Sequence, residues 1–213
     1  MPSFLIEDQL SPSENSIVVG IDEVGYGAIA GPVVAAAVYI HNRELAYIGE
    51  IKDSKKLSPK KRISLYAEIT RSAAYGIGYA SVEEIEEYNI LVASHIAMRR
   101  ALVDLDLQPD LVLVDGIRSP DLQWPCETIV SGDDISTTIA AASIVAKVTR
   151  DRMMSELGEQ HPEYSWSKNK GYGTKEHILS VRLHGETPHH RRTFAPLKAN
   201  KPEKKEDEYT HIL

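Results

Sequence analysis

Four acidic residues could do chemistry together, because each follows an apolar segment of the chain. Asp22 and Glu23 stand side by side at the end of "SIVVGID", Asp115 ends "DLVLVD" and Asp133 follows "ETIVSG". Short, β-branched, apolar runs of this kind are typical of buried strands. Ligand sites of open α/β sheets lie at strand ends, so we expect these acids to converge if their strands are neighbours.

A cluster of carboxylates predicts a divalent cation, since such a cluster cannot stay fully ionised without a compensating charge. Oxygen ligands favour Mg²⁺ or Mn²⁺ over zinc, and Cys126, the only cysteine, cannot supply a set of thiolates. A pair of such ions can support hydrolysis of a phosphodiester. Each acid taken alone is equally typical of a helix cap, a turn or a salt bridge, so the prediction depends on all four acting together.

A glycine-rich loop, "GYGAIAG", follows the first two acids and contains Gly25, Gly27 and Gly31. Glycine tolerates positive φ and lets backbone N–H groups approach a ligand closely. A plain hairpin turn between two strands is the alternative. A P-loop lysine does not follow these glycines, so we do not expect a nucleoside triphosphate site.

Alternating strands and helices must position these residues. Strands are predicted over residues 16–22, 31–40, 73–82, 110–116 and 127–133, and helices over 58–70, 81–105, 136–157 and 174–185. Ser58 with Pro59, and the capping box of Ser81 with Glu84, mark two helix starts. The helix of residues 81–105 is expected to break near Tyr88 and Asn89. This order predicts a mixed α/β sheet covered by helices.

The length of 213 residues suits one domain, which we place at residues 16–197. Residues 1–15 form an N-terminal extension, and the charged residues 198–213 are expected to form a flexible tail. The sequence shows neither a run near the ~20 apolar residues of a membrane span nor a secretory signal. With a single cysteine, these features favour a cytoplasmic protein without a membrane partner, and we expect a monomer.

The charge distribution favours an anionic partner in one part of the chain. The net charge of −7 argues weakly against nucleic acid, yet residues 147–198 hold ten Lys and Arg against six Asp and Glu. A second basic cluster, from Lys52 to Arg62, holds six cations and one acid. Local basic patches matter more for phosphate binding than the net charge does, although solvated charged faces are the alternative.

Several motifs together resemble one known family. "GIDEVGYGAIAGPVVAAAV" resembles the signature of bacterial ribonuclease HII, a type 2 ribonuclease H. The other matching segments, in the order of that family, are "IKDSKKLSPKKR", "LVLVDG", "SGDDISTTIAAASIVAKVTRDRMM", "NKGYGTKEH" and "HRRTFAP". They run from about Val18 to Pro196, which is nearly the whole chain, and the combination is highly specific.

The resemblance implies a fold and an activity. The fold is the ribonuclease H-like α/β fold, a mixed five-stranded sheet flanked by helices with a mostly helical C-terminal portion. The activity is endonucleolytic cleavage of the RNA strand of RNA–DNA hybrids, and cleavage 5′ to single ribonucleotides embedded in duplex DNA. It uses Mg²⁺ or Mn²⁺, in a two-metal site, and leaves 5′-phosphate and 3′-hydroxyl ends.

Roles for particular residues also follow from the resemblance. It assigns metal binding and catalysis to the four acids, Asp22, Glu23, Asp115 and Asp133. The loop of Gly25, Tyr26 and Gly27 would read the ribose 2′-hydroxyl through its backbone, and Tyr172 would pack on the sugar of the following deoxynucleotide. Phosphate contacts, which position a duplex without reading its sequence, are expected from Lys55, Lys147, Arg150 and Arg191.

Two positions depart from the family pattern. Tyr26 stands where the family usually has arginine, and tyrosine cannot offer a guanidinium fork to a phosphate. Ser131 stands where the family usually has lysine, which removes another cation near the acids. Both departures bear on substrate and metal preference more than on the class of reaction.

Three other functions remain open on the residues alone. A junction resolvase would share the acids but not the glycine loop and Tyr172. A non-catalytic hybrid-binding module would not need all four acids. A glycosidase-type carboxylate pair would act without metal and would leave the basic clusters without a task.

Overall fold

A computed structural model describes residues 1–11, 13 and 15–200 and is built around one five-stranded sheet. Its strands are β1 (Val18–Val24), β2 (Val33–Tyr39), β3 (Ala74–Ala80), β4 (Leu111–Asp115) and β5 (Cys126–Ile129), in the order β3-β2-β1-β4-β5. The β1–β2 and β2–β3 pairs are antiparallel, and the β1–β4 and β4–β5 pairs are parallel. The predicted mixed five-stranded sheet is therefore confirmed.

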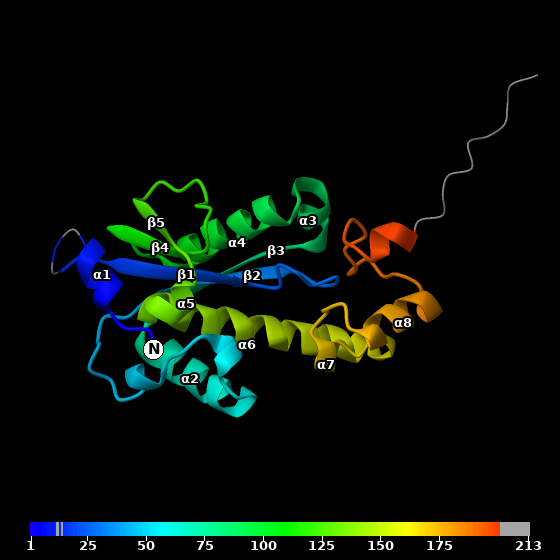
Figure 1. Cartoon of the computed structure of the whole chain (residues 1–213), viewed down its shortest axis with the longest axis horizontal. Coiled ribbons are helices and arrows are strands. Elements are labelled where there is room, and N and C mark those ends of the chain that lie inside the picture. Colours follow the sequence, from blue (N-terminus) through cyan, green and yellow to red (C-terminus); the bar gives the residue numbers. More distant parts are fainter. Residues whose placement is uncertain (12, 14, 201–213) are drawn as a thin grey trace, which may run out of the picture.

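Helices cover both faces of the sheet (Figure 1). They are α1 (Leu5–Leu10), α2 (Pro59–Ser72), α3 (Val82–Tyr88), α4 (Ile90–Leu105), α5 (Gly132–Ile135), α6 (Thr137–Gln160), α7 (Trp166–Asn169) and α8 (Lys175–His184). Helix α4 packs on one face, and α6, backed by α2, packs on the other. The C-terminal part of the described chain, from α6 onward, is mostly helical, as predicted.

Local sequence signals explain where several helices begin. The Ser58 hydroxyl accepts a hydrogen bond from Lys61 N, and Pro59 opens α2. The capping box of Ser81 and Glu84 is formed at the start of α3. Asn89, with a φ of 71°, separates α3 from α4 and caps α4 through its side chain. The predicted break in this helical region is confirmed.

Two apolar layers fix the sheet between its helices. One lies between the sheet and α4, and the other between the sheet, α6 and α2. Gly20 allows α6 to approach β1 closely, because a Cβ at this position would lie 2.3 Å from the backbone carbon of Thr138. This close packing holds the carboxyl end of β1 in a fixed place beside α6.

The structure differs from the sequence prediction at the fifth strand. Strand β5 ends at Ile129, and Asp133 lies in the short helix α5 rather than at a strand end. Ser131, with a φ of 55°, turns the chain between the two elements. The apolar run followed by an acid thus marks the region where β5 ends. A turn and the start of α5 stand between the strand and Asp133.

The N-terminal residues pack on the rest of the domain. Residues 1–11 include α1, and Ser3 pairs with Ser136 in a parallel bridge, so this part of the predicted extension packs on the sheet-and-helix body. Residues 201–213 of the predicted tail lie outside the described residues. Among the described helices, none is long and apolar enough to cross a membrane.

Candidate active site

Two of the predicted acids are brought together by the parallel pairing of β1 and β4. Ile21 is the register partner of Val114, so the next residues, Asp22 and Asp115, stand beside each other at the carboxyl end of the pair. This is the edge at which open α/β sheets bind ligands. The sequence prediction that these two strand ends converge is confirmed by the register.

The third acid, Asp133, reaches the same place from α5. The Asp115 carboxylate accepts a hydrogen bond from Gly132 N at 2.7 Å, which ties the start of α5 to the end of β4. Ligand oxygens of Asp22, Asp115 and Asp133 all lie within 4.8 Å of one another. Residues far apart in the chain therefore present three carboxylates to one point.

The electrostatics of this cluster require a positive charge. Burial raises the pKa of Asp22 well above its usual value, and the charges of Glu23, Asp115 and Asp133 raise it further. Burial, with the charge of Asp115, raises the pKa of Asp133 to about 6, and burial also raises the pKa of Asp115. Each shift means that the ionised form is disfavoured unless a cation is present.

A divalent cation fits this donor set. The three close carboxylates offer oxygen ligands of the kind that Mg²⁺ and Mn²⁺ prefer, and the described residues place no thiolate among them. Glu23 is not within the close trio. Burial and the Asp115 charge nevertheless raise the pKa of Glu23 to about 7, so it belongs to the same electrostatic cluster.

Lys55 is the cation nearest the trio among the predicted phosphate-binding residues. Its Nζ lies 3.8 Å from Asp133 Oδ2, and its side chain is 78% exposed. It sits in the 3₁₀ turn Ser54–Lys56, which begins where the Asp53 carboxylate accepts from Lys55 N at 2.8 Å. Sequence analysis did not single out Asp53, although it lies within the "DSK" segment; it is buried, and its charge raises the pKa of Asp133.

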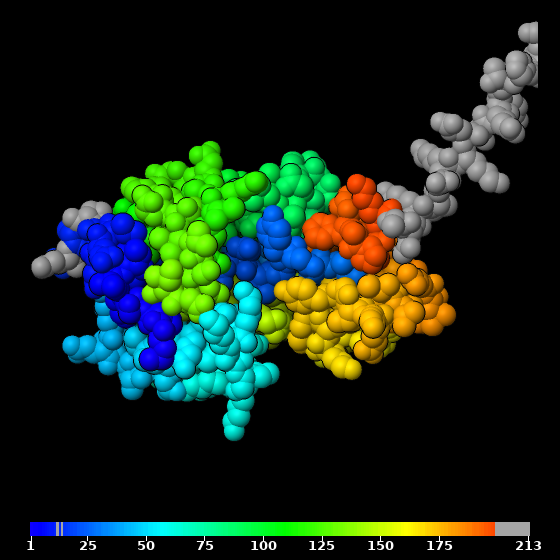
Figure 2. Space-filling model, viewed as in Figure 1, coloured from blue at the N-terminus to red at the C-terminus, as the bar shows by residue number. Residues whose placement is uncertain are grey.

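The glycine loop between β1 and β2 holds an unusual backbone beside the acids. Gly25 has a φ of +99°, and a Cβ there would lie 2.1 Å from Arg150 Nε, so no larger residue fits without displacement. Tyr26 is 43% exposed and Gly27 is open to solvent. Figure 2 shows the mid-blue β1–β2 segment at the surface between the green elements and the orange C-terminal segment.

A cavity of about 370 Å³ adjoins this loop. Glu23, Tyr26 and Asp115 line one side, and Ser94, His95 and Arg118 line another. Sequence analysis missed these last three residues. Ser94 and His95 belong to α4, which carries none of the quoted motifs, so only the tertiary fold reveals that they face the acids.

Tyr172 lies between α7 and α8, in the segment that follows the long helix α6. Its ring centroid is 5.5 Å from Arg150 Cζ and 5.9 Å from Lys147 Nζ. Tyr172 O is 3.0 Å from His177 Nδ1, which fixes the backbone that carries the ring. The tyrosine predicted to contact a sugar is thus held beside two cations.

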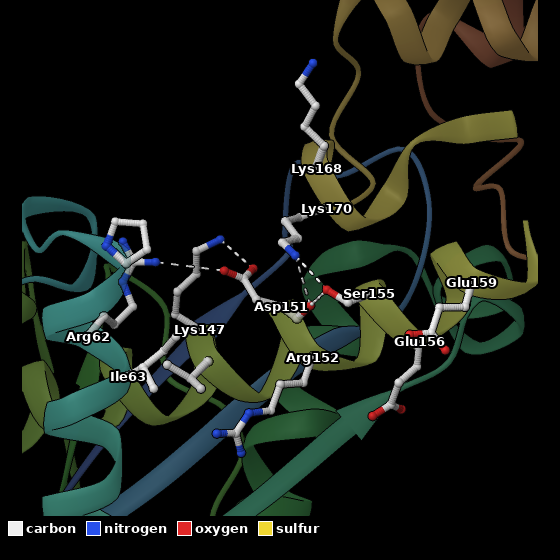
Figure 3. Close-up of a pocket in the computed structure, with 12 residues that line it drawn as sticks. Arg62, Ile63, Lys147, Asp151, Arg152, Ser155, Glu156, Glu159, Lys168 and Lys170 are labelled. Atoms are coloured by element: carbon white, nitrogen blue, oxygen red, sulfur yellow. Dashed lines mark hydrogen bonds and ion pairs between the residues drawn. The ribbon is translucent and has the colours of Figure 1, made fainter. Parts of the chain in front are cut away.

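Lys147 opens onto a cavity of about 630 Å³, which lies between α2, α6 and α7 (Figure 3). Its Nζ donates to Asp151 Oδ1 at 2.7 Å, and Arg62 approaches the same carboxylate at 3.9 Å. Lys170 donates to Ser155 at 2.7 Å on the same side of the cavity. Lys147 is partly buried, with 17% of its side chain exposed, and a phosphate would compete with Asp151 for it.

The structure contradicts direct phosphate binding by Arg150 and Arg191. Both side chains are fully buried, and most of their donors point to backbone carbonyls of the glycine loop and its surroundings. Arg191 Nη2 has no hydrogen-bond partner among the described residues. The sequence showed two cations in a basic segment but not that the fold turns them inward. A guanidinium without solvent access cannot reach the backbone of a duplex.

Comparison with known proteins identifies the family. Residues 19–197 match the family "Ribonuclease HII". The ribonuclease HII of Anaplasma marginale is 64% identical over 199 residues, covering 93% of this chain and 82% of that protein. The ribonuclease HII of Anaplasma phagocytophilum is 63% identical, covering 93% of this chain and 95% of that protein.

Solved structures agree with this comparison. Ribonuclease HII of Archaeoglobus fulgidus, solved in a complex with PCNA, superposes with a TM-score of 0.70 at 26% identity, covering 84% of this chain and 95% of that one. Bst-RNase HIII in complex with Mn²⁺ shares the fold, with a TM-score of 0.70 at 20% identity over 93% of this chain and 72% of that one. With its motifs, its acid cluster and these relatives in agreement, the chain belongs to the ribonuclease HII family.

Proposed function

We propose that this chain, a ribonuclease H of the HII family that hydrolyses the RNA strand of RNA–DNA hybrids, performs the reaction with Asp22, Glu23, Asp115 and Asp133. The observation that carries the assignment is the convergence of three carboxylates within 4.8 Å. Their raised pKa values support it, because they show that Lys55 alone does not offset the burial and mutual repulsion of these acids. The alternatives of a cap, a turn or a surface salt bridge do not account for three acids at one point.

Asp22, Asp115 and Asp133 would hold one or two divalent cations, with Glu23 completing the set. When bound, Mg²⁺ or Mn²⁺ supplies Lewis-acid activation of water and stabilises charge on the leaving oxygen of a phosphodiester. The chain itself orients the ligands: Gly132 N fixes the Asp115 carboxylate, and Glu23 N fixes that of Asp22 at 2.7 Å. Lys55, exposed and close to Asp133, would contact the substrate phosphate beside the acids.

Recognition of a ribonucleotide is assigned to the loop of Gly25, Tyr26 and Gly27 and to Tyr172. Backbone groups of an exposed glycine loop can bond the 2′-hydroxyl, which is the group that distinguishes RNA from DNA at one nucleotide. The Tyr172 ring, packed on the next sugar, would leave little room for a second 2′-hydroxyl. We therefore propose cleavage 5′ to a single ribonucleotide in duplex DNA, leaving 5′-phosphate and 3′-hydroxyl ends.

Three further features belong to this proposal. Either Mg²⁺ or Mn²⁺ suits the oxygen donors, and a two-metal site accommodates the acids. One copy of the chain contains all the assigned residues, which supports action as a monomer. Membership of a family with bacterial relatives supports a cytoplasmic location. Residues 16–197 are proposed as the catalytic domain, with residues 1–15 as an extension and 198–213 as a tail.

The experiment uses a duplex with one ribonucleotide, an all-RNA hybrid strand and a DNA-only duplex, each with Mg²⁺, Mn²⁺ or EDTA. We expect metal-dependent cleavage of the first two substrates and none of the third. Asp115→Asn should lower kcat/KM at least about 100-fold, since even residues that only support metal ligands are worth 10–100-fold. Asp121→Asn, at an exposed acid between β4 and β5, is the matched control and should cleave normally.

Particular results would contradict the proposal. Efficient cleavage of DNA without a ribonucleotide would favour a resolvase, and binding without cleavage would favour a hybrid-binding module. Hydrolysis that persists in EDTA would reject the role of divalent cations. Wild-type rates in Asp115→Asn would reject the assignment of the acids.

A further inference from the structure

Two buried arginines connect the two recognition elements of the proposed function. We propose that Arg150 and Arg191 are positioning residues, a guanidinium clamp that holds the loop of Gly25–Gly27 and the Tyr172 segment in the geometry needed to read one ribonucleotide. The inference rests on the proposed function, because it gives these arginines a task only if the loop and Tyr172 contact the substrate.

Arg150 joins segments that are far apart in the chain. From α6, its Nε donates to Pro32 O at 2.9 Å, its Nη2 to Ala30 O at 3.1 Å and its Nη1 to Lys170 O at 2.8 Å. Its Cζ also lies 5.5 Å from the Tyr172 ring centroid. A single side chain thus fixes the far end of the glycine loop and the segment that carries Tyr172.

Arg191 holds the same loop from the other side. Its Nε donates to Gly31 O at 2.9 Å and its Nη1 to Tyr26 O at 3.1 Å. The Tyr26 carbonyl shares a peptide group with the Gly27 N–H, which makes no backbone hydrogen bond within the described part of the chain. A cation at the carbonyl polarises that peptide, so the exposed N–H becomes a better donor to a substrate oxygen.

Backbone hydrogen bonds complete the connection. Gly171 O accepts from both Ile29 N, at 2.9 Å, and Ala30 N, at 3.1 Å. Gly31 N donates to His189 O at 2.8 Å, and Arg191 N donates to Ile29 O at the same distance. Three loops therefore lie edge to edge, with both guanidinium groups at their junction.

The free-energy cost of burying Arg150 and Arg191 favours a role in positioning the loops over a role in stability alone. Burial lowers the pKa of both arginines, and the nearby charge of Arg150 contributes to the fall of the Arg191 pKa to about 9. Neither has a salt bridge among the described residues, so the polar contacts that offset these two like charges are carbonyl oxygens. Burying a charge without an ionic partner costs free energy, so stability alone gives no reason for an arginine at either position. The planar fork, which bonds several carbonyls at fixed angles, is what a lysine or an apolar residue cannot supply.

The test compares Arg150→Lys and Arg191→Lys with Arg192→Lys, a matched control at the adjacent arginine, which is exposed and paired with Glu186 at 3.2 Å. Each variant keeps a long basic side chain but loses the planar fork of the guanidinium. Steady-state kinetics with Mg²⁺ are measured on the single-ribonucleotide duplex and on the all-RNA hybrid strand, with thermal unfolding of each variant alongside.

We expect both clamp variants to lose at least about tenfold in kcat on the single-ribonucleotide duplex, with KM changed less than about threefold. The loss on the all-RNA hybrid should be at least about threefold smaller, and Arg192→Lys should match the wild type. Equal losses on both substrates, or an unchanged ratio between them, would overturn the inference and leave the arginines a structural role. If Arg150→Lys does not fold, Arg191→Lys, which disturbs only two side-chain hydrogen bonds, decides the result in the same way.

Failure of the proposed function gives a different result. A wild-type enzyme that does not cut at a single ribonucleotide would reject the assigned substrate before any variant is compared. A wild-type enzyme that cuts there, with clamp variants that keep its selectivity, would reject the clamp alone.

Discussion

Contacts with neighbouring side chains hold Tyr172 in place. Lys147 and Arg150 lie near its ring, and His177 contacts its backbone carbonyl. A ring held in this way loses little freedom when a sugar packs on it. Its proposed contribution to recognition is therefore testable by removal of the ring alone.

Tyr172→Ala should lower kcat/KM on the single-ribonucleotide duplex by about tenfold or more, since aromatic packing on a nucleotide is worth ~1–3 kcal/mol. The loss on an all-RNA hybrid strand should be smaller, because neighbouring positions offer alternative registers. Tyr172→Phe keeps the ring and is the matched control. Competition between the two labelled substrates in one reaction measures the ratio directly; an equal effect on both would reject the sugar contact.

The site role of the acids could be predicted from the sequence better than the role of the arginines. Asp22 and Asp115 could be predicted because a strand end fixes where a carboxylate points. Arg150 and Arg191 could not, because an arginine in a basic segment has the same appearance whether it meets a phosphate or a backbone carbonyl. Only the packing of three distant loops decides between these partners, and local sequence does not encode it.

Helix α6 begins beside the proposed catalytic acids, and a residue of the N-terminal helix α1 contributes to its cap. Glu7 of α1 is fully buried, and its Oε1 accepts from Ser136 Oγ at 2.8 Å and from Thr138 N at 3.0 Å. A carboxylate at a helix N-terminus also interacts favourably with the helix dipole. The N-terminal residues thus stabilise the element that follows Asp133.

Glu7→Ala should lower the free energy of unfolding by about 2 kcal/mol, since it removes a helix cap and leaves buried donors unpaired. The matched control is Asp8→Ala, which changes the adjacent acid, an exposed residue paired with Arg43 at the surface. Urea unfolding followed by circular dichroism gives both values. A loss below about 0.5 kcal/mol for Glu7→Ala, the usual range for surface substitutions, would contradict the capping role.

For helices and strands, the sequence predicted which elements are present better than it predicted the residues at which they end. The caps at Ser58 and Ser81 and the break at Asn89 are local signals, so they could be read directly. The end of β5 and the start of α5 depend on Ser131 adopting positive φ and on Gly132 N meeting Asp115. That contact joins two segments that are separated in the chain, which no local pattern records.

The C-terminal portion of the described chain is tied together by a buried cluster of neutral histidines. Trp166 Nε1 donates to His177 Nε2 at 2.9 Å, which lies 3.1 Å from His190 Nε2, and Thr187 N donates to His190 Nδ1. Both histidines are buried. Burial is the main cause that lowers the pKa of His190 to about 4, and the neighbouring histidines, which would repel a second positive charge, lower it further.

The contribution of His190 to the stability of the molecule should therefore fall in acid. An unfolded histidine has a pKa of about 6.5, so between that pH and about 4 the unfolded state binds a proton that folded His190 does not. Stability contributed by this group is present above a pH of about 6.5 and is lost progressively toward about pH 4. The acids with raised pKa values act in the opposite sense, so only a comparison of variants isolates the histidine.

The comparison uses His190→Gln and, as a control, exposed His184→Gln. Denaturant unfolding from about pH 7.5 to about pH 5, a window that spans the unfolded pKa, should give a shallower loss of stability for His190→Gln than for the wild type. The profile of His184→Gln should be unchanged. Parallel profiles for all three proteins would show that His190 is not held neutral.

The sheet order has a consequence for the synthesis of the protein. Strand β1 lies between β2, which follows it directly, and β4, which is made much later. A nascent chain contains all of β1, β2 and β3 early, yet its Asp22 and Glu23 lack the other two acids of the cluster until Asp115 and then Asp133 have been added. If the four acids are the catalytic set, as we propose, a chain that has not yet been translated through α5 lacks Asp133 and should not cleave nucleic acid.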